Sequence, residues 1–429
     1  MYLVGFDSQE LACDPTVDYV KALDLFVRYR VNKVRVWIYC WFGTTSFHAL
    51  TPWATDGTGR HNLDRWNPAY WSRVRDFVRK ARERSIVVEI TIFAPYPAAR
   101  RWWSDGTHRV AWNKAHNGNQ VFSSNSRGHF QPEFFDLAHA ERSSSGKTLA
   151  DYQRSLVDKV MAELGAFGNV YFEVCNEFGA NRLDVDRWHP WQLRWGQRID
   201  GATPRLVAVH AGFDRQVKAP LYWEKEYVDV LNFRSTASPQ GMSDMLHPAQ
   251  TKGKVLSINE STSGDFHDSP RNLNNAMRVA WGIFLSGGHF ALYEDDSSRI
   301  GNARWIEAAK RLKAMRDIAE SIPFWELSPV DQEGREYDTL VSEGPSGSNR
   351  QLLAKPGATY LAYFWGRKST TGVAIRLPSS AFAYTWYDPR DARVLTTGAV
   401  TSSGTAHVPS PPPASWDEEA GLVLVIRKR

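Results

Sequence analysis

The sequence predicts an α/β fold, a (β/α)8 barrel followed by a small antiparallel β-sandwich. Strand-like and helix-like stretches alternate from residue 2 to about 322, which is the pattern of parallel strands joined by crossover helices. After Pro323 the pattern changes to short alternating strands separated by Gly, Pro and Ser clusters. We therefore expect a barrel over residues 1–322 and a sandwich over residues 323–429.

The candidate barrel strands are short apolar runs of the length that a buried parallel strand needs. Eight such runs match the number in a closed barrel. They are Leu3–Phe6, Lys33–Tyr39, Ile86–Phe93, Val170–Asn176, Arg205–His210, Val228–Phe233, Val255–Asn259 and Gly288–Tyr293.

Amphipathic helices are predicted between these strands. Apolar residues recur at helical spacing over Trp71–Ala81 and Tyr152–Leu164, and Gly165 is a plausible stop for the second helix. The last barrel helix is expected over Ala303–Ser321, just before Pro323. Each helix presents one apolar stripe to the sheet.

The sandwich strands are expected over Tyr360–Trp365, Val373–Leu377, Ala383–Tyr387 and Leu422–Ile426. The proline-rich run Pro409–Pro413 indicates a stiff loop before the final strand.

Composition allows a large core and argues against several partners. The chain has 429 residues and a formal charge of +5, from 52 basic and 47 acidic residues that are interspersed, so we expect no nucleic-acid partner. The 18 Trp, 16 Tyr and 21 Phe residues suit stacking on sugar rings and equally suit a large core. No 18-residue apolar span occurs, so no membrane partner is expected.

Cysteines and the first residues bear on the compartment. Cys13, Cys40 and Cys175 cannot all pair, and the last two lie in strand-like runs, so we expect no disulfide framework. The opening apolar stretch Met1–Phe6 is too short for a signal peptide. We expect a soluble protein, either cytoplasmic or secreted with its export signal removed from this sequence, and the oligomeric state stays open.

Two of the predicted strands each run directly into a glutamate, Glu177 after Val170–Asn176 and Glu260 after Val255–Asn259. Hydrolysis of a glycosidic bond needs two carboxyl groups, one that protonates the leaving oxygen and one that attacks or stabilises the anomeric carbon. Strands hold such groups more rigidly than loops do. The alternative is that either glutamate pairs with an arginine at the barrel rim.

The run Phe172–Glu177 resembles the end of the fourth barrel strand in glycoside hydrolase clan A, where an Asn-Glu pair carries the acid/base. Glu260 lies where that clan places its nucleophile, at the end of strand seven. Counting strands by periodicity also puts these glutamates on strands four and seven. The resemblance, closest to family 5-like members, implies a retaining hydrolase of a β-linked glycoside or polysaccharide that works by double displacement, with a carbohydrate substrate and no cofactor or metal. It also implies that Asn176 donates to the sugar 2-hydroxyl.

Arg35 lies in a strand that should be apolar on both faces, so its charge needs a buried carboxylate. The resemblance implies that Arg35 lies beside Glu260 and keeps it ionised. The alternative partner is Glu89 on the third strand. Trp37 points the same way as Arg35 by strand alternation, which makes it a candidate sugar contact.

The long segment after the third strand is expected to build the substrate cleft, because loops at that end of a barrel usually do. Its candidate sugar contacts are Trp102, Trp103, Asn113, His116 and Asn117, while Trp112 is expected more in the core. Core packing is the alternative for each tryptophan. His210, at the end of strand five, either lines the floor of the site or satisfies a rim hydrogen bond.

The match to clan A has departures. Many members carry a His-x-Tyr near the end of strand six, where this chain reads Leu231–Ser235. Strand eight usually ends in a tryptophan, where this chain has Tyr293 followed by Glu294, Asp295 and Asp296. We expect Tyr293 and Glu294 to contact substrate. The acidic residues favour hydroxyl binding or a solvated rim over a cation site, because no histidine lies at ligand spacing.

The segment Tyr384–Arg390 resembles the Trp-x-Asp-Pro-Arg segment of a β-sandwich, named as collagen-binding, that closes many barrel glycosidases. The resemblance implies that this sandwich covers part of the barrel. Two other functions remain open. One is a non-catalytic carbohydrate-binding barrel, and the other is a phosphate-handling barrel enzyme with backbone anion sites at Ser261–Gly264 and Ser286–Gly288.

Overall fold

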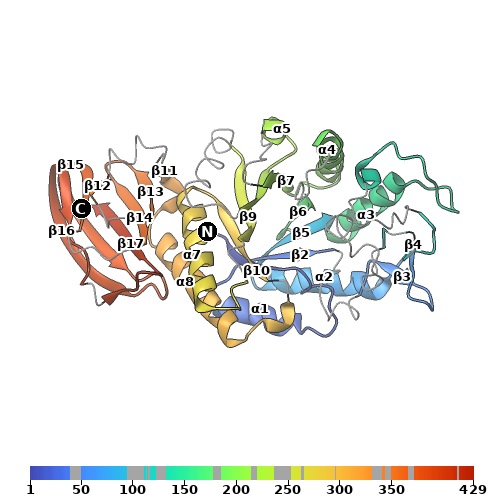
Figure 1. Cartoon of the computed structure of the whole chain (residues 1–429), viewed down its shortest axis with the longest axis horizontal. Helices are drawn as coiled ribbons and strands as arrows, with labels where there is room; N and C mark the ends of the chain where they lie inside the picture. Colours follow the sequence, from blue (N-terminus) through green and yellow to red (C-terminus); the bar gives the residue numbers. More distant parts are fainter. Residues whose placement is uncertain are drawn as a thin grey trace.

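A computed structural model describes residues 1–38, 50–93, 111–112, 114, 116–121, 132–176, 185–213, 220–235, 253–261, 265–294, 296–330, 341–343, 349–365, 372–412 and 415–429. For a few of these, including Glu260, only the backbone is described. The chain forms a closed parallel barrel with an antiparallel β domain beside it, at the left of Figure 1.

All of the predicted barrel strands are confirmed, and they close in the order β1-β10-β9-β8-β7-β6-β5-β2 with parallel neighbours. Because the strands are parallel, their carboxyl ends all meet at one end of the barrel. The strands are β1 (Val4–Ser8), β2 (Lys33–Trp37), β5 (Val87–Phe93), β6 (Val170–Cys175), β7 (Val207–Phe213), β8 (Val230–Ser235), β9 (Val255–Ser261) and β10 (His289–Glu294).

The described helices include the three that the sequence predicted, now α2, α3 and α8. They are α1 (Tyr19–Arg28), α2 (Pro68–Glu83), α3 (Leu149–Leu164), α4 (Val185–Ala202), α5 (Pro220–Trp223), α7 (Pro270–Leu285) and α8 (Ala303–Glu320), with 3-10 turns η4 (Pro132–Phe135), η5 (Ser297–Arg299) and η6 (Phe324–Glu326). A hairpin of β3 (Trp53–Thr55) and β4 (His61–Trp66) was not predicted.

Helix ends follow from local chemistry. Thr148 and Asp151 form a reciprocal capping box at the start of α3, which satisfies two backbone donors. The helix ends at Gly165 as expected, but Gly165 has the helical φ of −62° rather than a left-handed one. Its role is close approach, because an added Cβ would lie 2.6 Å from the backbone carbonyl oxygen of Met161, while the Thr203 hydroxyl donates to the Gly165 carbonyl at 2.9 Å.

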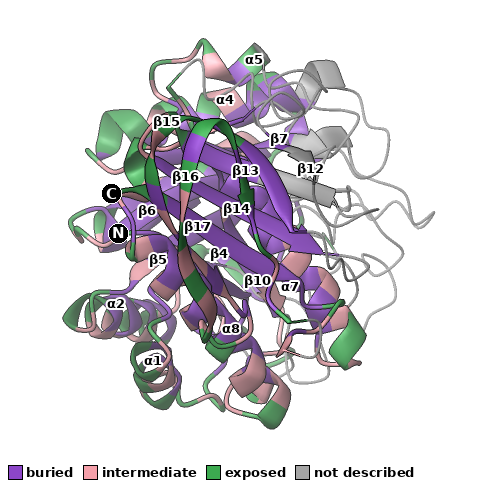
Figure 2. Cartoon of the chain, turned by 90° about the vertical axis from the view of Figure 1, so that its left-hand side faces the viewer, coloured by how far each residue is buried: buried purple, intermediate pink, exposed green. Residues whose placement is uncertain are grey.

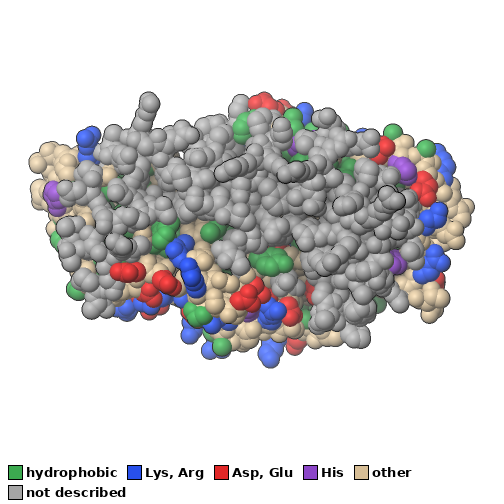
Figure 3. Space-filling view, viewed as in Figure 1, with side chains coloured by type: hydrophobic (Ala, Val, Ile, Leu, Met, Phe, Trp, Pro, Cys, Tyr) green, Lys and Arg blue, Asp and Glu red, His purple; other side chains and the backbone are tan. Residues whose placement is uncertain are grey.

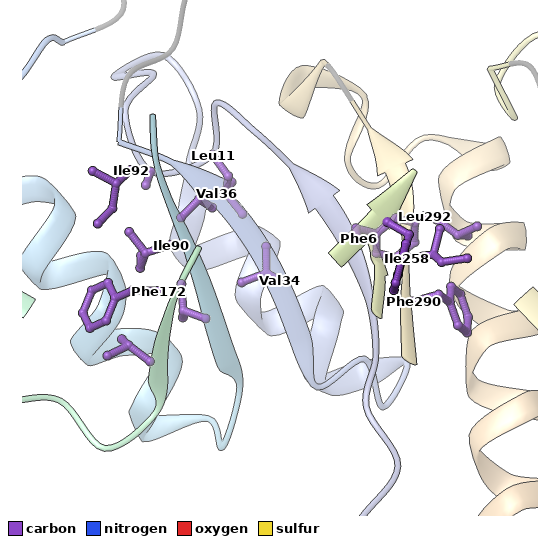
Figure 4. Close-up of a cluster of buried hydrophobic side chains, with 14 of the residues drawn as sticks. Phe6, Leu11, Val34, Val36, Ile90, Ile92, Phe172, Ile258, Phe290 and Leu292 are labelled. Carbon is purple, nitrogen blue, oxygen red and sulfur yellow. The ribbon is translucent and has the colours of Figure 1, made fainter. Parts of the chain in front are cut away.

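The outer faces of the strands are apolar and pack under the helices. Phe6, Val34, Ile90, Phe172 and Ile258 are buried at this face (Figure 4). The α8 ring of Trp305 stacks on Phe6 at 4.9 Å between ring centroids. This layer is the core that the helical stripes predict.

The inner faces of the strands differ from the expectation of apolar runs on both sides. Every second residue points into the barrel, and in β2, β5 and β6 these positions include Lys33, Arg35, Glu89, Thr91 and Glu173, all buried. The barrel is therefore filled by a polar cluster rather than by aliphatic layers alone.

The C-terminal domain is a mostly antiparallel β-sandwich. Its strands are β11 (Ser328–Pro329), β12 (Val341–Glu343), β13 (Asn349–Lys355), β14 (Thr359–Trp365), β15 (Val373–Tyr387), β16 (Val394–Val408) and β17 (Leu422–Lys428). Two predicted strands are one long strand, β15, whose register with β16 shifts between Leu377 and Ser380. The sequence did not predict β11, β12, β13 or β16; for β16 the reason is that its Thr, Ser and Gly residues are typical of turns.

The C-terminal domain packs against the barrel helix α7, and β14 is buried on both faces (Figure 2). Along β14, Tyr360, Ala362 and Phe364 enter the core of the sandwich, while Leu361 and Tyr363 join the barrel core. The ring of Trp281 from α7 stacks on Tyr363 at 5.5 Å. The predicted domain division after residue 322 falls between α8 and β11 and stays a prediction.

Cys13 takes part in a disulfide bond whose partner lies outside the described residues, and Cys175 is a buried free thiol. The sequence predicted no disulfide framework, and it did not predict this single bond at Cys13. Cys175 is buried as expected, as a small apolar residue at the carboxyl end of β6.

Charges are mixed over the described surface. In the space-filling view, basic and acidic side chains alternate over the described part of the face shown (Figure 3). Several form pairs within helices, such as Arg79 with Glu83 and Lys313 with Asp317. This distribution agrees with the interspersed charge of the sequence.

A cavity of about 420 Å³ opens at the amino-terminal end of the barrel, opposite the predicted glutamates. All of the barrel strands or the residues just before them contribute to its lining, among them Leu3, Lys33, Val87, Tyr171, Leu206, Val230, Val255 and His289. The ring of His289 stacks on Tyr2 at 5.1 Å. Burial, and then the charge of Lys33, lower the pKa of His289 to about 4.

The lowered pKa of His289 predicts a loss of stability in acid. Its ordinary value is about 6.5, so the unfolded chain binds this proton first and stability falls as the pH drops from about 6.5 through 4. We expect wild type to lose about 2 kcal/mol more than His289→Phe between pH 7 and pH 4.5. Urea unfolding at both pH values measures this. An equal loss in the two proteins would contradict a neutral His289.

Candidate functional site

The predicted catalytic positions lie at the carboxyl end of the barrel. Asn176 directly follows β6, the fourth strand, and its backbone N–H donates to the Phe93 carbonyl at 3.0 Å. Glu177 lies outside the described residues. Position 260 lies within β9, the seventh strand, with only its backbone described. The two strands are separated by β7 and β8 around the barrel.

A β-bulge precedes position 260. Phe233 of β8 pairs with Ile258, but the next pair joins Arg234 to position 260, so Asn259 is one extra residue in β9. The register with β10 shifts at the same place. Bulges commonly lie beside functional sites, where they redirect side chains.

Arg35 lies at the centre of the polar cluster, fully buried. Its Nε and Nη2 atoms donate to Glu173 Oε2 at 3.0 and 2.5 Å, and Nη2 also donates to Asn176 Oδ1 at 2.6 Å. Its Nη1 atom lies 3.1 Å from Asp7 Oδ2. The alternative partner Glu89 is more distant, with Oε1 at 3.9 Å from Nε. The expected buried carboxylates therefore include Glu173 and Asp7, which the sequence did not single out.

Glu173 receives five hydrogen bonds from four other strands. Oε2 accepts from Arg35 twice and from Thr91 Oγ1 at 2.6 Å, and Oε1 accepts from the amides of Asn232 and Asn259 at 2.7 and 3.0 Å. Four of these five donors, on the guanidinium and the two amides, cannot accept a proton from Glu173, so these contacts favour its carboxylate form. Glu173 is thus an acceptor shared by β2, β5, β8 and β9.

Glu89 forms a second acceptor below Glu173, toward the amino-terminal end of the barrel. Its Oε1 accepts from Asn232 and Asn259 at 2.8 and 2.7 Å. Its Oε2 lies 2.9 Å from Lys33 Nζ and accepts from the Tyr171 hydroxyl at 2.6 Å. The two amides therefore bridge the two carboxylates.

The pKa values of the two carboxylates move in opposite directions. Burial raises the pKa of Glu89, but Lys33, Arg35 and the Tyr171 hydroxyl outweigh burial, so the pKa lies below its ordinary value. Burial is also the largest influence on Glu173; together with the charge of Glu89 it raises the pKa of Glu173 above the ordinary value despite Arg35. The cluster therefore keeps its charges at a considerable cost of desolvation.

Three predicted contacts lie on the inner face of the barrel. Trp37 is buried, with the Arg35 guanidinium 5.6 Å from its ring centroid. Tyr293 is half-buried and pairs in register with Asp7. His210 pairs in register with Asn232, and its backbone N–H and C=O bond to the side chain of Gln192 at 2.8 and 3.0 Å. Strand β7 continues beyond His210, so this residue lies deeper in the barrel than predicted.

Glu294 is buried at the end of β10, where its Oε2 lies 2.5 Å from His267 Nε2 and its Oε1 accepts from the Asp296 N–H at 3.2 Å. His267 lies in the connection that follows β9. Asn302, the N-cap of α8, approaches the other ring nitrogen of His267 at 3.4 Å. Glu294 therefore ties the connections after β9 and β10 together, and a contact with sugar hydroxyls stays a prediction.

The segment after the third strand is described only in part. Trp102, Trp103 and Asn113 lie outside the described residues. The backbone carbonyl of His116 accepts from His61 at 2.9 Å. The buried amide of Asn117 donates to the carbonyls of Ala111 and Val121, both at 3.0 Å, so these contacts hold the loop, and a sugar contact by Asn117 stays a prediction.

Trp112 packs in the core, edge-on to Trp53 at 5.0 Å, as expected. The two stretches named as backbone anion sites lie at opposite ends of the barrel. Ser286–Gly288 precedes β10, at the amino-terminal end of the barrel, whereas Ser261 ends β9 at the other end. Residues 262–264 lie outside the described residues, and an anion site at either stretch stays a prediction.

Sequence reasoning missed most of the polar cluster. The signal was present as polar residues at alternate positions of otherwise apolar strands, at Glu89 and Thr91 in β5, Glu173 in β6, and Ser257 and Asn259 in β9. A buried polar group needs a partner, so such positions predict that strands share an inner network. Only Arg35, with Glu89 as its alternative partner, was interpreted in this way.

The described residues also bear on metal binding and on membrane insertion. Within the described residues, no group of three or more His, Cys, Asp and Glu side chains has the arrangement of a metal site. The helices of the described ranges are too short or too polar to cross a bilayer.

No known family model and no curated protein sequence matches the chain. Solved structures do match its fold. A family 5 glycoside hydrolase from Bacteroides vulgatus aligns over 100% of this chain and 89% of its own, with a TM-score of 0.65 and 13% identity. A family 30 subfamily 8 xylanase from Clostridium acetobutylicum aligns over 99% of this chain and 96% of its own, with a TM-score of 0.54 and 12% identity. An endo-1,4-β-mannanase from Rhizomucor miehei aligns over 74% of this chain and 95% of its own, with a TM-score of 0.52 and 12% identity. At these identities the likeness shows a shared fold.

Proposed function

We propose that this protein is a retaining glycoside hydrolase of clan A that cleaves a β-linked glycoside or polysaccharide. Glu177 serves as the acid/base and Glu260 as the nucleophile. The observation that carries the proposal is that the asparagines preceding both glutamates, Asn176 and Asn259, belong to one buried network at the carboxyl-terminal half of the barrel. The fold shared with solved glycoside hydrolases supports it.

The proposed reaction proceeds by two displacements. Glu260 attacks the anomeric carbon while Glu177 gives its proton to the leaving oxygen, and water then resolves the glycosyl-enzyme with Glu177 as base. Such a mechanism needs carboxyl groups about 5 to 5.5 Å apart. The bulge at Asn259 supports this geometry, because it changes the alternation of side chains, and we propose that position 260 follows Asn259 toward the interior.

Asn176 is suited to hold the sugar 2-hydroxyl. Its amide oxygen accepts from Arg35 at 2.6 Å, so the amide can act toward a ligand through its NH2 group. A donor to the 2-hydroxyl strengthens as the oxocarbenium-like transition state forms. The same bond to Arg35 keeps the amide in one orientation.

Arg35 lies below the proposed site and is expected to stabilise the ionised form of Glu260, although it also neutralises Glu173 and Asp7. Tyr293, level with Asp7 at the mouth of the barrel, is our candidate for the phenol that strand six does not supply. Sugar contacts by Trp37, Trp102, Trp103, Asn113, His116, Asn117, His210 and Glu294 remain predictions.

Product stereochemistry tests this proposal. A panel of aryl β-glycosides and of plant and microbial polysaccharides should first identify a substrate. Proton NMR of the first sugar released should then show the β-anomer, with the α-anomer appearing only later by mutarotation. An α-anomer formed first would rule out a retaining mechanism. Binding without release of reducing ends would favour a non-catalytic carbohydrate-binding barrel.

A further inference from the structure

Glu173 contacts neighbours of both proposed catalytic glutamates. We propose that Glu173 is a positioning residue that holds the ends of β6 and β9 in one arrangement, so that its negative charge sets the geometry and the ionisation of the reacting pair. This inference rests on the proposed function. Its evidence is the set of hydrogen bonds that meet at the two oxygens of Glu173.

One oxygen of Glu173 connects to the acid/base side. Arg35 Nη2 donates to Glu173 Oε2 at 2.5 Å and to Asn176 Oδ1 at 2.6 Å, so one guanidinium nitrogen bridges the carboxylate and the residue before Glu177. Thr91 Oγ1 donates to the same oxygen at 2.6 Å. Because Arg35 and Glu173 are fully buried, few other positions are open to the bridge.

The other oxygen connects to the nucleophile side. Glu173 Oε1 accepts from Asn259 Nδ2 at 3.0 Å and from Asn232 Nδ2 at 2.7 Å. Asn259 is the extra residue of the bulge that directly precedes Glu260. Ser257 Oγ donates to Asn259 Oδ1 at 3.0 Å, which fixes the amide with its NH2 group toward Glu173. The bulge is therefore held by Glu173 together with Glu89, whose Oε1 accepts from the same amide at 2.7 Å.

Glu89 shares the two asparagine amides but serves the opposite end. Its remaining oxygen is occupied by Lys33 and Tyr171, which lie toward the amino-terminal end of the barrel. Glu173 instead takes the Arg35 bridge that reaches Asn176. Of these two carboxylates, Glu173 is thus the one that connects to both catalytic strand ends.

The test is Glu173→Gln, which keeps the size of the side chain but places an NH2 group against existing donors. We expect kcat to fall by about 100-fold, the scale of a small misplacement of reacting groups, with KM changed by less than about threefold. Loss of one negative charge should also lower the pKa values of neighbouring carboxyl groups, so both limbs of the pH–rate profile should move to lower pH.

Asp229→Asn is the matched control. Asp229 Oδ2 accepts from the Val207 N–H at 2.8 Å at the amino-terminal end of the barrel, so the variant loses one carboxylate and the same charge far from the proposed site. We expect its kcat and pH profile to equal those of wild type. Any loss of thermal stability in the two variants is compared in parallel.

Hydrogen exchange gives a readout that does not need turnover. In Glu173→Gln, peptides covering residues 170–180 and 255–265 should both exchange faster, whereas Asp229→Asn should leave them unchanged. If Glu173→Gln does not fold, Thr91→Val removes one of the five donors and keeps the charge, so it should show the same faster exchange and a fall in kcat of about tenfold, without the shift of the pH profile. Wild-type kcat, pH profile and exchange in the folded variants would overturn the proposal.

The outcomes separate this inference from the proposed function. If the first product is retained in configuration but Glu173→Gln behaves as wild type, the positioning role is wrong and the hydrolase stands. If no glycoside is hydrolysed, the exchange of the two strand ends still decides whether Glu173 holds them. Faster exchange in only one of the two peptides would contradict a shared anchor.

Discussion

Glu260→Ala is expected to lose nearly all turnover, by about 10⁵-fold in kcat/KM, equivalent to about 7 kcal/mol of transition-state stabilisation. The methyl group cannot form the glycosyl-enzyme, and the space left is near the anomeric carbon. Added azide should occupy that space and restore turnover of an activated aryl β-glycoside, giving a glycosyl azide of inverted configuration. Initial rates and NMR of the product measure both effects.

The control for Glu260→Ala is Glu326→Ala, which removes an exposed carboxylate that pairs with Lys355 in the region between barrel and sandwich. This variant should keep wild-type activity and should not respond to azide. A glycosyl azide of retained configuration from Glu260→Ala would remove the nucleophile role from Glu260. Turnover close to wild type without azide would remove any catalytic role.

Glu177→Gln should slow the enzyme according to the leaving group. An alkyl or sugar leaving group needs a proton from the acid, so we expect a loss of about 10³-fold for such substrates. A dinitrophenyl glycoside leaves without protonation, so its first step should be nearly unchanged, although the second step loses its general base. Burst and steady-state kinetics with a series of aryl glycosides separate the two steps.

Equal losses across the series would mean that Glu177 is not the proton donor. The dinitrophenyl substrate acts as the internal control, because it reports whether the variant still folds and binds. The basic limb of the pH–rate profile should also disappear in Glu177→Gln, since that limb reports ionisation of the acid.

The barrel could be predicted from sequence because its strands and helices carry strong local patterns. The stripe from Trp71 to Ala81 repeats at helical spacing, and these side chains are buried in α2 as predicted. The apolar runs that end at Asn176 and before Glu260 fall on the fourth and seventh strands of the closed barrel. Local periodicity and strand order were therefore sufficient for the fold.

The polar cluster could not be predicted with the same accuracy. The charge of Arg35 does indicate a buried carboxylate, but the sequence does not say how the strands are staggered. The stagger decides that Glu173, from the fourth strand, lies closer to the guanidinium than Glu89 from the adjacent third strand. A bulge at Asn259 likewise depends on pairing across strands, which a single strand does not reveal.

The hairpin β3–β4 and the strand β16 were missed for a different reason. Their residues are polar on one side or rich in Thr, Ser and Gly, so their pairing comes from neighbouring strands rather than from local preference. The disulfide at Cys13 was missed because three cysteines leave the pairing undetermined.

Because β14 is buried on both faces, the tail of this protein is not a detachable module. Tyr363 lies against Trp281 on one side while Phe364 enters the sandwich on the other. Removal of the C-terminal domain would expose the apolar surface of α7 to water. Transfer of this domain to another enzyme would need a helix with a matching apolar surface. A change to the packing surface of either part would therefore have to be matched by a change in the other.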